Sequence, residues 1–226
     1  MPVMQRGYGT ANVKAPDPTR SGALVVLEGI DGCGKSTMAR RLVEWFQSNR
    51  IEAVFSFEPT LERYGAELRR SFEEGRRLTP EEELKLFEQD RRMHVEQLIG
   101  PNMEAGRVVV LDRYYYSSMA YQGVRGVYRP DEVHALMTSF APVPDVAVFL
   151  DIPVETAVQR IMSGRGEVPN VMEKRDNLQR VREAFLAVDL PEWRRIDAAA
   201  PPERVFTSLL AVVQDPLERA GLWPVT

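Results

Sequence analysis

A glycine-rich turn between an apolar, β-branched run at 23–28 and an amphipathic segment from Lys35 constrains this chain more than any other feature. Glycines let the backbone curl so that successive N–H groups point at phosphate oxygens, and a helix that starts there adds the positive end of its dipole. The turn matches the pattern G-x-x-x-x-G-K-[ST] and lies between a strand and a helix, as that pattern requires. We therefore predict a phosphate-binding loop, Gly29-Ile30-Asp31-Gly32-Cys33-Gly34-Lys35-Ser36.

The side chains of this loop suggest separate roles. Lys35 can bring a cation to the β- and γ-phosphates of ATP, and Ser36 can offer its hydroxyl to Mg²⁺. We expect the Lys35 ammonium to be solvated except where it meets phosphate. Cys33 is expected to pack inside the loop and not to act as a nucleophile. The expected ATP-binding residues are Gly29, Ile30, Asp31, Gly32, Cys33, Gly34, Lys35, Ser36 and Thr37.

Composition narrows the class of protein. The 226 residues suffice for one large domain, and 44% hydrophobic with 27% charged residues is ordinary for a globular chain. A net charge of −4 provides no basic field for nucleic acid. A single cysteine fits a reducing cytoplasm, and no apolar run is long enough to span a membrane. We expect a cytoplasmic protein that binds neither nucleic acid nor membrane.

Short apolar runs alternate with longer amphipathic segments, which predicts an α/β fold with a parallel sheet. The predicted strands are 23–28, 51–57, 108–112, 145–151 and 193–197. The predicted helices are 35–49, 61–74, 80–105, 114–122, 131–139, 154–163, 173–188 and 202–215, with a bend expected at Gly100-Pro101. We divide the chain into an N-terminal tail (1–20), one domain (21–215) and a C-terminal tail (216–226).

Three predicted strands end in an acidic residue, namely Glu28, Asp112 and Asp151. Ligands of open α/β sheets bind outside the carboxyl ends of the strands, so these residues are candidates for a site, although each could be a solvated strand end. Asp112 could act on Mg²⁺ directly or through water. The pair Asp112-Arg113 could also be a plain surface ion pair.

A helix is predicted to begin at Thr79, which forms a capping box with Glu82. On this helix Arg91 shares one stripe with apolar residues and should point inward beside Phe87. An inward arginine needs either an anionic partner from the protein or a substrate group to bind. Both explanations remain open at this point.

Three segments resemble thymidylate kinases: the loop 27–37, Leu86–Arg92 and Leu111–Gly123. The resemblance covers roughly 23–198 and is most specific in Asp-Arg-Tyr through Ala-Tyr-Gln-Gly. It implies a P-loop fold with five parallel strands in the order 2-3-1-4-5, a small lid and a homodimer. The implied activity is in-line transfer of a phosphoryl group from Mg-ATP to dTMP, which gives dTDP for dTTP biosynthesis.

The resemblance also implies roles for single residues. Phe87 would stack on thymine, and Arg91 would donate to a base carbonyl. Asp31 would receive the 3′-hydroxyl of the acceptor sugar, and Tyr121 would fill the place of a ribose 2′-hydroxyl. Arg113 would bridge the two substrates' phosphates. The implied dTMP-binding residues are Asp31, Glu58, Phe87, Arg91, Arg113, Ser117, Ser118, Tyr121 and Gln122, although the two serines could simply form a first helical turn.

Two departures from the family pattern stand out. Phe57 precedes Glu58-Pro59 where many members carry arginine, so Arg69 or Arg63 would have to supply the lost phosphate contact. The second departure is Val171, which falls in the predicted lid (about 160–175) where many bacterial members have a second arginine.

The lid should cover ATP through Arg165, which is flanked by Gly164 and Gly166, with Arg160 as a second candidate. A solvated connection is the alternative. The expected catalytic residues are Lys35, Arg113, Arg165 and Asp31, with Ser36 and Asp112 for the metal. A kinase for another nucleoside monophosphate and a nucleotide-binding regulatory module remain alternative functions.

Overall fold

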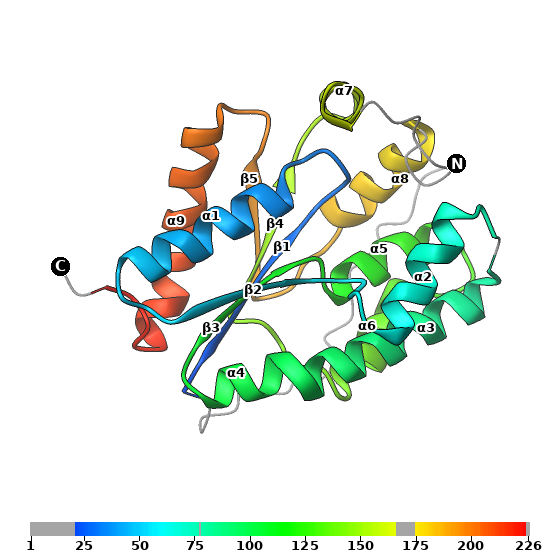
Figure 1. The fold of residues 1–226 in the computed structure, drawn as a ribbon. Helices are drawn as coiled ribbons and strands as arrows, with labels where there is room; N and C mark the ends of the chain where they lie inside the picture. The colour runs from blue at the N-terminus through cyan, green and yellow to red at the C-terminus, as the bar shows by residue number, and fades with distance from the viewer. Residues whose placement is uncertain (1–20, 77, 166–174, 225–226) are drawn as a thin grey trace.

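Five parallel strands form one sheet in the order β2-β3-β1-β4-β5, as expected (Figure 1). The structure is a computed structural model that describes residues 21–76, 78–165 and 175–224. Strands β1 and β3 pair in the middle of the sheet, and the segments that follow them carry the site. The strands are β1 (Ala23–Glu28), β2 (Ala53–Phe57), β3 (Val108–Asp112), β4 (Val146–Asp151) and β5 (Trp193–Asp197).

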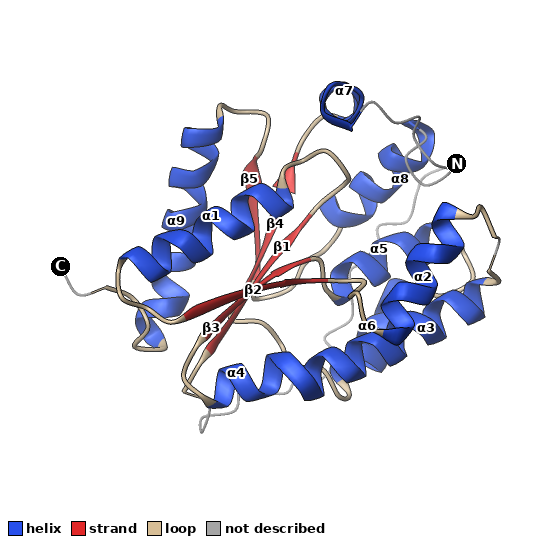
Figure 2. Ribbon diagram, viewed as in Figure 1, coloured by secondary structure: helices blue, strands red, loops and turns tan. Residues whose placement is uncertain are grey.

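Helices cover both faces of the sheet (Figure 2). In Figure 1, α1 and α9 lie together on one side, and α3, α5, α6 and α8 lie on the other. The helices are α1 (Lys35–Ser48), α2 (Arg63–Glu73), α3 (Pro80–His94), α4 (Gly100–Glu104), α5 (Tyr115–Val124), α6 (Pro130–Thr138), α7 (Val154–Arg165), α8 (Arg175–Leu186) and α9 (Pro202–Arg219).

The central strands are buried along their whole length. Every residue of β1, β3 and β4 is buried, as a parallel sheet covered on both faces requires. In the register, Leu27 of β1 lies opposite Asp112 of β3. The sheet therefore brings Glu28 and Asp112 to the same carboxyl edge, where the glycine-rich loop also begins.

Most helix ends shift by one or two residues from the sequence prediction, and three differences have a clear physical basis. The segment 80–105 is α3, a π-helical turn at Val95–Ile99 and then α4, and this wider turn lies where Pro101 removes a backbone donor. Helix α7 continues to Arg165, because a glycine inside a helix costs only about 1 kcal/mol. Helix α9 runs to Arg219, and Leu217 is fully buried, so the start of the expected C-terminal tail packs on the core.

The expected N-terminal tail and residues 166–174 of the expected lid lie outside the described residues. Within the described ranges, no helix combines the length and the hydrophobicity that crossing a bilayer would need.

Candidate active site

The phosphate-binding loop forms directly between β1 and α1. Gly34 precedes α1 with φ of 98°, and Gly32 has φ of 81°, a left-handed backbone that glycine adopts without strain. Gly32 also lies against α7, because a Cβ there would be 2.5 Å from the carbonyl oxygen of Ala157. Both glycines are thus required by the backbone, although the motif specifies only Gly34 of the two.

Lys35 is buried, which corrects the expectation that its ammonium is solvated. Its Nζ donates to the carbonyl oxygens of Gly29 (3.0 Å) and Ile30 (3.1 Å), and it lies 3.9 Å from Asp31 Oδ1. The loop curls around its own lysine and so satisfies the cation with carbonyl groups. Cys33 is buried in the same loop, as expected.

Ser36 and Asp112 form a pair beside Lys35. The Ser36 hydroxyl donates to Asp112 Oδ2, while Oδ1 is buried and has no hydrogen-bond partner among the described residues. A hydroxyl and a carboxylate with a vacant oxygen are the ligands that Mg²⁺ takes in phosphate sites. The two residues therefore fit such a cation.

Arg113 follows β3 and connects the loop to α5. Its guanidinium donates to Asp31, to Ser117 Oγ at 3.0 Å and to the Tyr121 hydroxyl at 3.4 Å. It also lies over the Tyr121 ring, 5.2 Å from the centroid. These contacts fix the guanidinium from three sides, so Asp112-Arg113 is not the plain surface ion pair considered above.

Glu28, at the end of β1, anchors the start of α5. Its carboxylate accepts hydrogen bonds from the N–H groups of Tyr114 and Ser117 and from Ser117 Oγ (2.6 Å). Burial raises the pKa of Glu28 from 4.5 to about 7, against the opposing effects of Ser117 and Arg113. The third strand-end acid, Asp151, is different, because it pairs with Arg182 and Arg195 and so ties α8 to β5.

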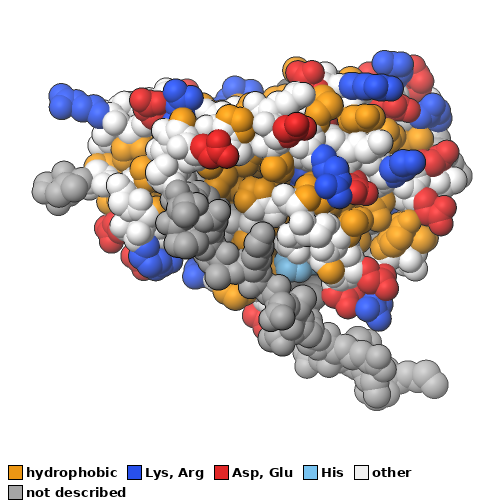
Figure 3. Space-filling model, turned by 90° about the horizontal axis from the view of Figure 1, so that it is seen from below, with side chains coloured by type: hydrophobic (Ala, Val, Ile, Leu, Met, Phe, Trp, Pro, Cys, Tyr) orange, Lys and Arg blue, Asp and Glu red, His pale blue; other side chains and the backbone are white. Residues whose placement is uncertain are grey.

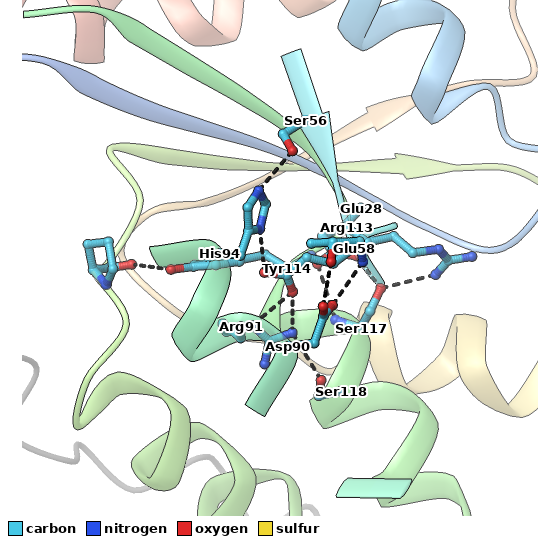
Figure 4. A network of polar contacts seen from close by, with 12 residues as sticks. Glu28, Ser56, Glu58, Asp90, Arg91, His94, Arg113, Tyr114, Ser117 and Ser118 are labelled. Atoms are coloured by element: carbon cyan, nitrogen blue, oxygen red, sulfur yellow. Dashed lines mark hydrogen bonds and ion pairs between the residues drawn. The ribbon is translucent and has the colours of Figure 1, made fainter. Parts of the chain in front are cut away.

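Arg91 points inward, as predicted, and meets a buried network (Figure 4). Its Nε and Nη2 donate to Glu58 Oε2 at 2.9 and 2.6 Å, and His94 Nδ1 lies 3.0 Å from Glu58 Oε1. Although burial opposes ionisation of Glu58, Arg91 and His94 together hold its pKa below the ordinary value. Arg91 Nη2 also reaches Ser118 Oγ at 3.3 Å.

The anionic partner considered above thus exists, but it does not use the whole guanidinium. Arg91 Nη1 is buried and has no hydrogen-bond partner within the described part of the chain. The N–H groups of this nitrogen therefore remain for a bound molecule.

Two cavities share a wall at these residues. The larger, about 850 Å³, is lined by Gly32–Met38 and extends to Ala198 and Pro202; the smaller, about 220 Å³, lies under α3 and α5. Five residues line both cavities: Asp31, Glu58, Pro59, Arg69 and Arg113. The smaller cavity also brings together the predicted residues Glu58, Phe87, Arg91, Ser117, Ser118, Tyr121 and Gln122.

The structure distinguishes the two arginines considered as replacements at Phe57. Arg69 lines both cavities, lies 5.1 Å from the Phe57 ring centroid and donates to the carbonyl groups of Pro59 and Thr60. Arg63 instead lies over the Tyr64 ring. Arg69 is therefore the candidate for the missing phosphate contact.

The lid residues are only partly described. Arg160 lines the larger cavity and donates to the carbonyl oxygen of Ala198 at 3.1 Å. Arg165 ends α7 and is followed by residues outside the described ranges. Arg175, at the start of α8, pairs with Glu155.

Two residues beside the smaller cavity, His94 and Glu83, were not among the predicted site residues. The α3 sequence does carry a signal for both. Glu83, Phe87 and Arg91 recur every four residues, and His94 follows Arg91 by three, so all of them share one face of the helix.

Comparison with known proteins agrees with this geometry. The family model for thymidylate kinase matches residues 27–209. The chain belongs to the thymidylate kinase family. Proteins named thymidylate kinase include relatives from Xylella fastidiosa strain M12 (46% identical; 87% of this chain and 88% of the relative) and from Akkermansia muciniphila (48%; 82% and 88%). A third, from Desulfotalea psychrophila, is 40% identical over 88% of this chain and 98% of its own length.

Proposed function

We propose that this chain transfers the γ-phosphoryl group of Mg·ATP to dTMP and releases dTDP and ADP. The observation that carries the proposal is the pair of cavities that meet at Asp31, Arg69 and Arg113, one of them built on the phosphate-binding loop. Two phosphorylated ligands placed there would bring their phosphates together at the guanidinium groups of Arg69 and Arg113. Membership of the thymidylate kinase family supports the same reaction.

In this proposal the larger cavity holds ATP. The backbone of the loop and the Lys35 ammonium would bind its β- and γ-phosphates. Ser36 and Asp112 would hold Mg²⁺, which would neutralise phosphate charge when bound. The attacking phosphate of the acceptor is already ionised, so the residues' task is to position it and to stabilise charge.

The smaller cavity would hold thymine against Phe87. Arg91 Nη1 is a buried donor without a partner and Gln122 Oε1 a buried acceptor without one, counting the described residues only. They complement the O4 acceptor and the N3–H donor of thymine, whereas cytosine carries a 4-amino donor in place of O4. Arg113 would contact the phosphates, Asp31 the sugar, and Tyr121 and Ser117 would support Arg113.

A homodimer in the cytoplasm is part of the same proposal. On the face shown in Figure 3, hydrophobic side chains gather between charged ones, and a second copy could cover such a face. Light scattering on the purified protein tests the dimer. We expect a particle mass equal to that of two chains.

A coupled assay of ADP release with dTMP, dUMP, dCMP and dGMP tests the activity. We expect the highest kcat/KM with dTMP. A higher value with dCMP or dGMP would identify a kinase for another nucleoside monophosphate. Tight ATP binding without dTMP-dependent ADP release would instead indicate a regulatory module.

A further inference from the structure

The smaller cavity contains a buried amide that is held from behind. The Gln122 side chain is 1% exposed, and its Nε2 donates to Glu83 Oε1 at 2.8 Å. Its Oε1 lacks a hydrogen-bond partner among the residues that the structure describes. Leaving a buried acceptor unpaired costs free energy, so this oxygen is a candidate contact for a ligand.

Glu83 determines which end of this amide faces the cavity. An ionised carboxylate only accepts hydrogen bonds, so the amide must turn its NH₂ group toward Glu83 and its oxygen away. Arg125 Nη1 lies 2.7 Å from Glu83 Oε2, and this cation favours the ionised carboxylate. Glu83 and Arg125 together therefore leave one orientation for Gln122.

The start of α3 does not explain why Glu83 is buried. Glu81 and Glu82 already provide negative charge to the first turn, and both are exposed. The Arg125 side chain is 29% exposed, so solvent reaches it and it does not require a buried partner. Burial removes water from the Glu83 carboxylate, which disfavours its charged form and raises its pKa. A role of Glu83 in orienting the Gln122 amide at the smaller cavity accounts for its burial.

We propose that Glu83, paired with Arg125, is a positioning residue that favours thymine over cytosine by fixing the Gln122 amide. This inference rests on the proposed function. A fixed Oε1 accepts from N3–H of thymine but faces the lone pair on N3 of cytosine. The reversed amide would instead donate to cytosine.

Replacing Glu83 with glutamine tests the inference, because a neutral amide can donate or accept and so permits both orientations of Gln122. We expect Glu83→Gln to lower the ratio of kcat/KM for dTMP to that for dCMP by on the order of 10-fold. The change should come from a higher KM for dTMP and a lower KM for dCMP, with kcat for dTMP nearly unchanged. General loosening of the site would lower kcat/KM for both substrates together and leave their ratio unchanged. An unchanged ratio therefore overturns the inference.

Glu81→Gln makes the same chemical change at an exposed site on the same helix and should leave the ratio unchanged. If Glu83→Gln does not fold, Arg125→Met, which removes the supporting cation from a partly exposed site, should lower the ratio in the same direction. In a Gln122→Met background, adding Glu83→Gln should not change the ratio further. A wild type that prefers dCMP would overturn the proposed function as well, whereas a wild type that prefers dTMP confines any failure to Glu83.

Discussion

The buried carboxylate of Glu28 should make the stability of this protein depend on pH in an unusual direction. Burial raises the pKa of Glu28 from 4.5 to about 7 in the folded protein. Between these two values the folded state binds a proton that the unfolded state does not. Stability therefore falls as pH rises through this window, by about 3 kcal/mol in total for this group.

The substitution Glu28→Gln keeps the shape of the side chain and removes the titration. We expect the variant to gain about 2 kcal/mol relative to the wild type when the pH rises from about 5.5 to about 8. Urea unfolding followed by circular dichroism at the two pH values gives both free energies of unfolding. Only the difference between variant and wild type is interpreted, because the other titrating groups cancel in it.

The result that would refute this reasoning is a difference between Glu28→Gln and wild type that stays constant across the two pH values. It would mean that the hydrogen bonds from Ser117 and Tyr114 outweigh the desolvation of Glu28. Glu44 is exposed on α1, so Glu44→Gln serves as the matched control and should give a constant difference.

Two further predictions concern the cations around ATP. Lys35→Ala should lower kcat by on the order of 10²-fold or more while circular dichroism shows an intact fold, and near-normal turnover would argue against a catalytic role for Lys35. Arg165→Ala should lower kcat strongly with little change in the ATP dissociation constant, and Arg165→Lys should restore only part of the loss. The same measurements on Arg160→Ala and Arg175→Ala complete the test. If one of these two variants loses kcat and Arg165→Ala does not, the lid assignment is wrong.

Short-range sequence patterns predicted the frame of the site well. The strands at Ala23–Glu28 and Val108–Asp112 and the capping box of Thr79 and Glu82 are present as expected. Each depends on residues close together in the chain, where periodicity and capping chemistry act. The inward direction of Arg91 was predictable for the same reason.

The supports of the site were harder to predict, because they join distant segments. Glu58 meets Arg91 and His94 across more than thirty residues, and Glu83 meets Gln122 across 39. No local sequence pattern predicts that such distant residues pair. The burial of Lys35 was also missed, since the closed curl of the loop around its own side chain is a three-dimensional property.

The contact between Gly32 and Ala157 links the sequence of the phosphate-binding loop to the position of helix α7. The Cβ atom of any side chain at position 32 would clash with the backbone of α7, whatever charged group the side chain carried. The residue would also have to adopt a left-handed backbone. Substitution of Gly32 alone therefore does not place a basic residue at this position. Helix α7 would have to shift as well, so the sequence of the loop and the position of that helix are constrained to change together.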